Sequence, residues 1–119
     1  MKPRITIGPE VDIHTLEFVQ VIIEFSILPA HTLMRTSQNI SVDAANERVQ
    51  KSYEDFKKEL SILLGEKGYS YTIIHRYTAS LNGVAMKLQG IAIQQLLSSQ
   101  VIQGIYPNRE MRIPEKPIM

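Results

Sequence analysis

The side chains that most often carry chemistry are few and scattered in this sequence. Its three histidines are His14, His31 and His75, and no two of them have the spacing of a metal-ligand pair. The serines lie in none of the contexts of a serine nucleophile, such as a Gly-x-Ser-x-Gly turn. Carboxylates and basic residues alternate over 48–59, which is typical of a solvated helix face. The sequence therefore predicts a chain that is not an enzyme and binds no metal.

Length and composition limit the remaining classes. The chain has 119 residues, enough for one domain, and 44% of them are hydrophobic, enough for a core. Thirteen Lys and Arg residues balance twelve Asp and Glu residues, whereas binding to nucleic acid requires a concentrated basic surface. The absence of cysteine excludes disulfides, thiolate zinc sites and a cysteine nucleophile. We therefore expect no nucleic-acid partner, and the lack of a glycine-rich phosphate loop predicts no cofactor.

The sequence contains no signal for a membrane. No apolar run approaches the roughly 20 residues that span a bilayer, so no membrane partner is expected. The start, MKPRITIGPEVD, lacks the continuous apolar segment of a signal peptide. Secretion is therefore expected only if a signal peptide precedes this sequence.

The first third of the chain is expected to supply one strand. Residues 1–15 contain two prolines and a glycine and are expected to be an irregular lead-in. β-Branched and aromatic residues over 16–25 predict a central strand, because its apolar residues point to both faces. Pro29 ends this strand, and the polar connection over 30–41 has no clear structural signal.

A long helix is predicted next. Apolar residues recur at three- and four-residue spacing over 42–64, and charged residues occupy the opposite face. Ser41 or Asp43 is the expected N-cap, and Gly65 or Gly68 the left-handed stop. About 22 residues at about 1.5 Å rise would form a rod of roughly 33 Å.

The rest of the chain completes an alternating order of elements. Strands are predicted over 69–77, 84–88 and 101–113, and a short helix over 91–99. Asn82 and Gly83 form the turn before the second of these strands. The order strand, helix, strand, strand, helix, strand predicts an α+β, ferredoxin-like fold, with a four-stranded antiparallel sheet and two helices on one face.

Alternation along the strand over 84–88 divides its side chains between two faces. We expect Val84, Met86 and Leu88 under the helices, and Ala85 and Lys87 on the free face. The turn sets this choice, since a one-residue slip would exchange the faces. From the residues alone, simple solvent exposure of the free face is favoured. RNA binding is disfavoured because this strand lacks aromatic residues for stacking.

Two segments of the chain resemble the propeptide (inhibitor) domain of subtilisin-like serine proteases, and most of all those of large extracellular subtilases of Gram-positive bacteria. They are LLGEKGYSYTIIHRYTASLNGVAMKL and IQQLLSSQVIQGIYPNREMRI, within a likeness that covers 19–113. The family shows an Asn-Gly-Phe-Ala-like element with a Leu close behind, a short helix, and then Val-x-x-Val-Tyr-Pro-Asn. The matching residues are Asn82, Gly83, Val84, Ala85, Leu88, Ile102, Ile105, Tyr106, Pro107 and Asn108. Val84 departs from the usual Phe, so a smaller side chain must fill the core there.

The resemblance implies a function, a partner and a location. Such domains fold as ferredoxin-like units, assist the folding of an attached protease, and stay bound after cleavage as temporary inhibitors. Their free sheet face packs on the protease, and their C-terminal segment lies in the active-site cleft. The partner would be a cognate subtilisin-like catalytic domain, and the location would be outside the cell or in the cell wall of a bacterium.

The resemblance also assigns roles to residues of this chain. It implies a protease interface formed by Ala85, Lys87, Tyr106, Asn108, Arg109, Met111 and Ile113. It implies structural roles for Asn82, Gly83, Val84, Met86, Leu88, Ile102, Ile105 and Pro107. The inhibitor domain would span 16–113, followed by an extended tail over 114–119.

The position of the natural cut is a separate expectation. If it followed Met119, Pro117 would stand two residues before it, where proline lacks the backbone N–H that pairing with the enzyme requires. We therefore expect processing at another place. Two other functions stay open: a stand-alone inhibitor or interaction module of the same fold, and a ferredoxin-like domain that binds a small ligand or RNA. Weak self-association through the free sheet face is a further expectation.

Overall fold

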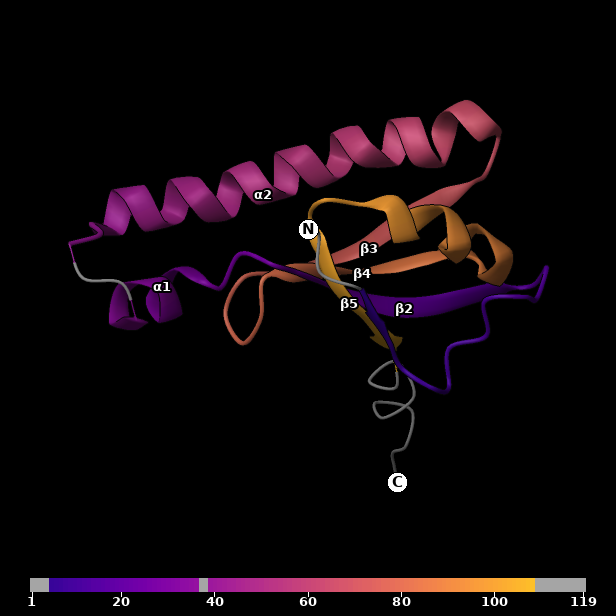
Figure 1. Ribbon diagram of the computed structural model, residues 1–119, viewed down its shortest axis with the longest axis horizontal. Helices are drawn as coiled ribbons and strands as arrows, with labels where there is room; N and C mark the ends of the chain where they lie inside the picture. Colours follow the sequence, from indigo (N-terminus) through magenta and orange to yellow (C-terminus); the bar gives the residue numbers. More distant parts are fainter. Residues whose placement is uncertain (1–4, 37–38, 109–119) are drawn as a thin grey trace, which may run out of the picture.

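The structure is a computed structural model that describes residues 5–36 and 39–108. Its elements are β1 (Thr6–Ile7), β2 (Phe18–Phe25), α1 (Ala30–Thr36), α2 (Val42–Leu63), η1 (Gly65–Lys67), β3 (Tyr71–Tyr77), β4 (Gly83–Gln89), η2 (Gly90–Ser98) and β5 (Ile102–Pro107), where η marks a 3-10 helix. Figure 1 shows α2 and η2 on one side of the sheet, and α1 beside the first turns of α2.

The strands form one mixed sheet in the order β1-β5-β2-β4-β3. β2 pairs antiparallel with β4 and β5, and β3 pairs antiparallel with β4. β1 pairs parallel with β5 through Thr6 and Ile7. The prediction of four antiparallel strands is therefore corrected to five strands, one of them parallel. The added strand lies in the segment that was expected to be irregular, because two residues are too few to show alternation.

The long helix α2 confirms the predicted helix almost residue for residue. Ser41 is its N-cap, and the Ser41 hydroxyl accepts a hydrogen bond from the Ala44 N–H at 3.0 Å. After the short helix η1, Gly68 takes the left-handed conformation at φ 83°. The next element after η1 is β3, which is an edge strand of the sheet.

Two helical elements differ from the prediction. α1 occupies the connection that had no clear signal, and its Leu33 packs with Ala45 and Val49 of α2 in a small satellite cluster. η2 is a 3-10 helix rather than an α-helix, and it starts at Gly90. A Cβ at Gly90 would stand 2.3 Å from the backbone oxygen of Asp12, so the loop between β1 and β2 approaches η2 too closely for any side chain there.

The main core lies between the sheet and the pair α2 and η2. Val84, Met86 and Leu88 of β4 are fully buried in it. They share one cluster with Phe56 and Leu60 of α2, and with Ile93 and Leu96 of η2. The helices therefore cover one face of the sheet, and no helix of the described residues packs on the other face, called the free face below.

Candidate functional site

The free face of the sheet carries the side chains that alternate with the core residues. The pairing of β5, β2, β4 and β3 places these side chains in rows, each of which holds residues that lie opposite one another on the four strands. The central row holds Tyr106 (β5), Ile22 (β2), Ala85 (β4), and Ile74 and His75 (β3). The amide row, one step along, holds Asn108 (after β5), Gln20 (β2), Lys87 (β4) and Thr72 (β3). The two rows differ in character, since the first is mainly apolar and the second is polar.

A β-bulge shapes the end of the central row. The pairing of β3 with β4 shifts between Ile73 and His75, so Ile74 is the extra residue opposite Ala85. Ile74 belongs to neither core cluster and keeps 38% of its surface exposed. The His75 ring packs edge-on against Tyr77, with ring centroids 4.6 Å apart. The bulge thus leaves an apolar side chain on the surface at this edge of the sheet.

The other end of the central row is shaped by Tyr106 and Gly104. A Cβ at Gly104 would stand 2.4 Å from the Tyr106 hydroxyl oxygen and 2.6 Å from two ring carbons. The tyrosine ring therefore lies across Gly104, and only glycine leaves room for it. This contact fixes the aromatic ring against the strand, so it forms a rigid part of the surface.

The amide row contains polar atoms that make no hydrogen bond. They are Gln20 Oε1, Asn108 Oδ1 and Asn108 Nδ2, all buried. The Asn108 side chain keeps only 7% of its surface exposed. The backbones of these two residues are joined, because the Asn108 N–H donates to the Gln20 carbonyl at 3.2 Å. The next residue of the row, Lys87, is exposed, and its Nζ lies 6.0 Å from the centroid of the Phe18 ring.

The turn residues predicted to set the register have further contacts. Asn82 Nδ2 donates to the Ile27 carbonyl and to the Ser52 hydroxyl, both at 2.9 Å. These bonds join the turn to the loop after β2 and to α2. A Cβ at Gly83 would stand 2.0 Å from the Ile23 carbonyl oxygen, so β2 and β4 approach too closely there for any side chain. The pair therefore fixes which face of β4 meets the core.

Arg76 is a structural residue that the sequence did not reveal. Its guanidinium lies 4.6 Å from the Tyr53 ring centroid and 5.6 Å from that of Phe25, on the helix side of the sheet. It donates to the carbonyls of Tyr77 and Gly83. Burial lowers the pKa of Arg76, and the nearby Tyr53 side chain opposes that change. Arg76 therefore connects the two ends of the loop between β3 and β4 through its hydrogen bonds.

The predicted interface residues fall into two groups. The structure brings Ala85, Lys87, Tyr106 and Asn108 together on the free face. Arg109, Met111 and Ile113 lie outside the described residues. Ala85 keeps only 1% of its surface exposed, so its neighbours in the central row form most of the accessible surface there. Sequence reasoning missed Ile22, Ile74 and Gln20, although alternation along β2 could have placed two of them.

The predicted structural residues lie in or beside the core. Val84, Met86, Leu88, Ile102 and Ile105 are all buried in the main cluster. Pro107 is the last residue of β5, and a Cβ at Gly8 would stand 3.1 Å from its ring. The end of β5 is thus in contact with the segment that follows β1.

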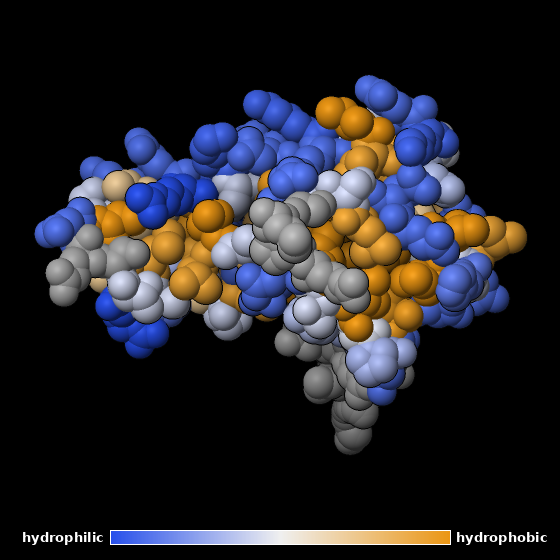
Figure 2. Space-filling view, viewed as in Figure 1, coloured by the Kyte–Doolittle hydropathy of each residue, from blue (hydrophilic) through white to orange (hydrophobic). Residues whose placement is uncertain are grey.

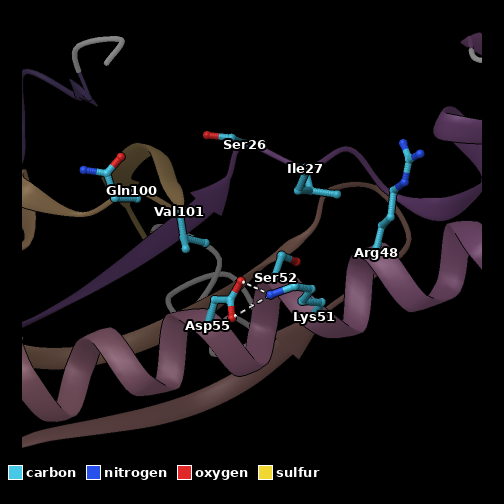
Figure 3. A pocket seen from close by; sticks show the side chains of 8 residues that line it. All are labelled: Ser26, Ile27, Arg48, Lys51, Ser52, Asp55, Gln100 and Val101. Atoms are coloured by element: carbon cyan, nitrogen blue, oxygen red, sulfur yellow. Dashed lines mark hydrogen bonds and ion pairs between the residues drawn. The ribbon is translucent and has the colours of Figure 1, made fainter. Parts of the chain in front are cut away.

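A surface hollow lies on the helix side, away from the free face. It has a volume of about 300 Å³ and is lined by Ser26, Ile27, Arg48, Lys51, Ser52, Asp55, Gln100 and Val101. Figure 3 shows Lys51 and Asp55 pointing toward each other, and their Nζ–Oδ2 distance is 3.1 Å. These two charges pair with each other on α2, and Arg48 is the third charged residue of the lining.

The remaining surface shows no metal or membrane signal. Within 5–36 and 39–108, no group of three or more His, Cys, Asp or Glu residues could hold a metal ion. In the same ranges, no helix is both long and apolar enough to cross a bilayer. Figure 2 shows hydrophilic side chains along the outer side of α2, with hydrophobic surface near α1 and around η2.

Comparison with known proteins gives one match. The family described as Peptidase inhibitor I9 matches residues 20–114. The matched range contains most of the chain and runs from β2 through β5, so it includes both rows of the free face. The searches of curated proteins and of solved structures find no match.

Proposed function

Because the chain belongs to the peptidase inhibitor I9 family of subtilisin propeptides, we propose that it binds a subtilisin-like serine protease, inhibits it for a time and assists its folding. A domain of this family is a non-catalytic inhibitor. The observation that carries the finer proposal is the central row, an apolar surface that no helix of the described chain covers. The protease catalytic domain is the partner that we assign to this surface.

The chemistry of the central row supports a protein partner. Ile22, Ile74 and Tyr106 come from three strands, and their positions are fixed by backbone pairing. A surface held in this way loses little conformational freedom on binding, so the burial of its apolar area favours a complex. Tyrosine is among the side chains that most often anchor protein interfaces, and Tyr106 lies in this row.

The C-terminal segment is the second part of the proposal. Arg109, Met111 and Ile113 follow β5 at alternate positions. We assign this segment to the active-site cleft, where it would block substrate by competition. Main-chain hydrogen bonds of an added strand would give affinity, and alternate side chains in pockets would give specificity. The family match, which extends to residue 114, supports this assignment.

The folding role follows from linkage. A domain that binds the native protease but not its unfolded chain stabilises the native state by its own binding free energy. An attached propeptide acts at high effective concentration, which strengthens the effect. Action outside the cell or in the cell wall of a bacterium is part of the same proposal, and it rests on the resemblance to propeptides of extracellular subtilases.

The first prediction tests inhibition through the free face. The full chain is added to a panel of purified subtilisin-like proteases, and hydrolysis of a chromogenic peptide is followed over time. We expect competitive inhibition that is slowly relieved as the inhibitor is degraded. Ile74→Asp should weaken it by about tenfold or more, since a charge would be buried at the interface. The matched control is Ile62→Asp, at a residue 55% exposed on α2, which should inhibit like the wild type.

Two results would contradict the proposal. A folded chain that inhibits no protease of the panel at micromolar concentration would remove the inhibitor function. Equal inhibition by the Ile74 and Ile62 variants would show that the central row is not the interface.

A further inference from the structure

The segment over 5–17, called the strap below, lies before the residues that the family model matches, yet it is built into the fold. Its β1 pairs with β5, and its Ile5 is buried in the main core cluster. The Gly8 N–H donates to the Ile105 carbonyl at 2.8 Å. A Cβ at Gly8 would stand 3.1 Å from the Pro107 ring. The strap therefore contacts β5 as far as the last residue of that strand.

The strap is also bound to η2. The Ile91 N–H donates to the Thr15 carbonyl at 2.9 Å. The exposed Gln94 side chain donates through Nε2 to the Ile13 carbonyl at 2.8 Å. At Gly90 the strap backbone leaves no room for a Cβ, which would stand 2.3 Å from a carbonyl oxygen. The strap thus connects the edge of the sheet to the helix that precedes β5.

Of the two neighbours of β5, the strap is the weaker. It pairs with β5 over two residues in parallel, whereas β2 pairs with β5 antiparallel from Val21 to Phe25. Parallel pairing is slightly less stable per residue. Segments held by few bonds open locally at a lower free energy than core strands. Opening of the strap would leave the pairing of β2 intact and make β5 an edge strand of the sheet.

An edge strand is vulnerable beside a protease. Its unpaired N–H and C=O groups are free for strand addition, in which an extended segment pairs through its main chain with another protein. With the strap in place, this side of β5 is covered from Gly104 to the Pro107 ring. β5 also leads directly into the segment that we assign to the active-site cleft. A cut in β5 would separate that segment from the rest of the domain.

We propose that the strap protects β5 from proteolysis, and that opening of the strap determines how long the domain lasts as an inhibitor. The second part of this inference rests on the proposed function. Inhibition would end when the strap opens and the protease cuts β5, while the main core is still folded. The lifetime of inhibition then depends on the local stability of the strap rather than on the stability of the whole domain.

Two variants weaken the strap in different ways. Gly90→Ala places a methyl group where the strap backbone lies. Gln94→Ala removes one hydrogen bond to the strap at an exposed residue, so it tests the inference even if Gly90→Ala does not fold. The matched control is Gly65→Ala, whose Cβ would stand 3.8 Å from the Leu60 carbonyl oxygen, an ordinary contact distance.

Hydrogen exchange followed by mass spectrometry tests the strap in the free chain. Peptides that cover the strap and β5 should exchange about tenfold faster in Gly90→Ala, and about threefold faster in Gln94→Ala, which loses one exposed hydrogen bond. Peptides of α2 should exchange as in the wild type. Gly65→Ala should leave the strap and β5 unchanged. An equal increase over β5 and α2 would show general destabilisation and would overturn the inference.

A protease assay tests the consequence. Each variant is mixed with a subtilisin-like protease that the wild type inhibits, and recovery of activity is followed. Initial inhibition should match the wild type, since the substitutions lie outside the free face. Activity should return sooner by the same factors, about tenfold for Gly90→Ala and about threefold for Gln94→Ala, because cleavage follows the population of the open strap. Mass spectrometry should find the first cut within 102–108.

The outcomes separate this inference from the proposed function. If the wild type inhibits no subtilisin-like protease, the proposed function fails, and so does the link between the strap and inhibition; the exchange measurement still tests the hold of the strap on β5. If exchange over β5 is unchanged in both variants, the strap does not protect that strand. If β5 exchanges faster but inhibition lasts as long as in the wild type, the strap does not determine the lifetime of the inhibitor.

Discussion

Asn82 ties three parts of the chain together through one side chain. It stands at the start of β4, and its amide nitrogen donates to the loop after β2 and to Ser52 of α2. Only 1% of its surface is exposed. The bonds hold the turn in one register, and the register decides which side chains of β4 form the free face.

The second prediction concerns this residue. Asn82→Ala should lower the free energy of unfolding by about 2–3 kcal/mol, because buried partners in the loop and on α2 lose their hydrogen bonds. The measurement is equilibrium unfolding in urea. Asn46→Ala, on the exposed side of α2, is the control and should change stability by no more than about 0.5 kcal/mol. Equal effects of the two substitutions would mean that Asn82 acts only as a turn residue.

At the residue scale, the sequence predicts the buried half of β4 better than its free half. Strict alternation was enough to place Val84, Met86 and Leu88 in the core. The exposure of Ile74 depends on a bulge, and a bulge depends on how two strands meet, which neither strand's own pattern encodes. The unpaired amide of Gln20 has the same origin, since only the assembled sheet determines its neighbours.

Glu59 joins α2 to the segment between η2 and β5. Its carboxylate accepts hydrogen bonds from the Ser99 hydroxyl and from the Gln100 N–H, the latter at 2.7 Å. The Ser99 hydroxyl in turn accepts from the N–H groups of Val101 and Ile102. One carboxylate thus connects the long helix to the point where η2 ends and β5 begins.

The third prediction belongs to this connection. Glu59→Ala should lower the free energy of unfolding by about 2 kcal/mol, since hydrogen bonds to a charged group are worth more than neutral ones. Thermal and urea unfolding measure the change. Glu47→Ala, at an exposed position of the same helix, is the matched control and should be nearly neutral. If Glu59→Ala is also neutral, packing alone fixes the start of β5.

At the element scale, long periodic segments were predictable and short ones were not. α2 spans 22 residues, so its apolar stripe extends over about six turns and its N-cap stands out. α1 has seven residues and β1 has two, too few for a period to appear. η2 reads as an α-helix from its apolar spacing, whereas the close approach of the loop at Gly90 favours the narrower 3-10 form.

The whole molecule has one main core and one satellite. The main cluster joins side chains from the sheet, α2 and η2, while the small cluster lies between α1 and the start of α2. Both clusters contain side chains of α2, so the same helix is stabilised by packing at both of its ends. Because one helix carries side chains of both clusters, we expect the two clusters to fold together and without a partner.

The fourth prediction follows from the helix that the two clusters share. The isolated chain should unfold in urea in a single transition, with far-ultraviolet circular dichroism and tyrosine fluorescence changing together. Both probes are informative because helices and tyrosines are spread over the molecule. Loss of helical signal before the fluorescence change would show that the satellite cluster melts separately. A chain that is unfolded alone and folds only with protease would show that the core depends on the partner.

The position of β5 has a consequence for the order of events during synthesis. β5, the last strand of the described residues, is inserted between β1, near the beginning, and β2. While a ribosome is still making residues before Ile102, β1 has no neighbour and one side of β2 is unpaired. The sheet closes only when the end of β5 has emerged, through contacts of long sequence separation that form slowly. The free face of the sheet is therefore complete only after this late step.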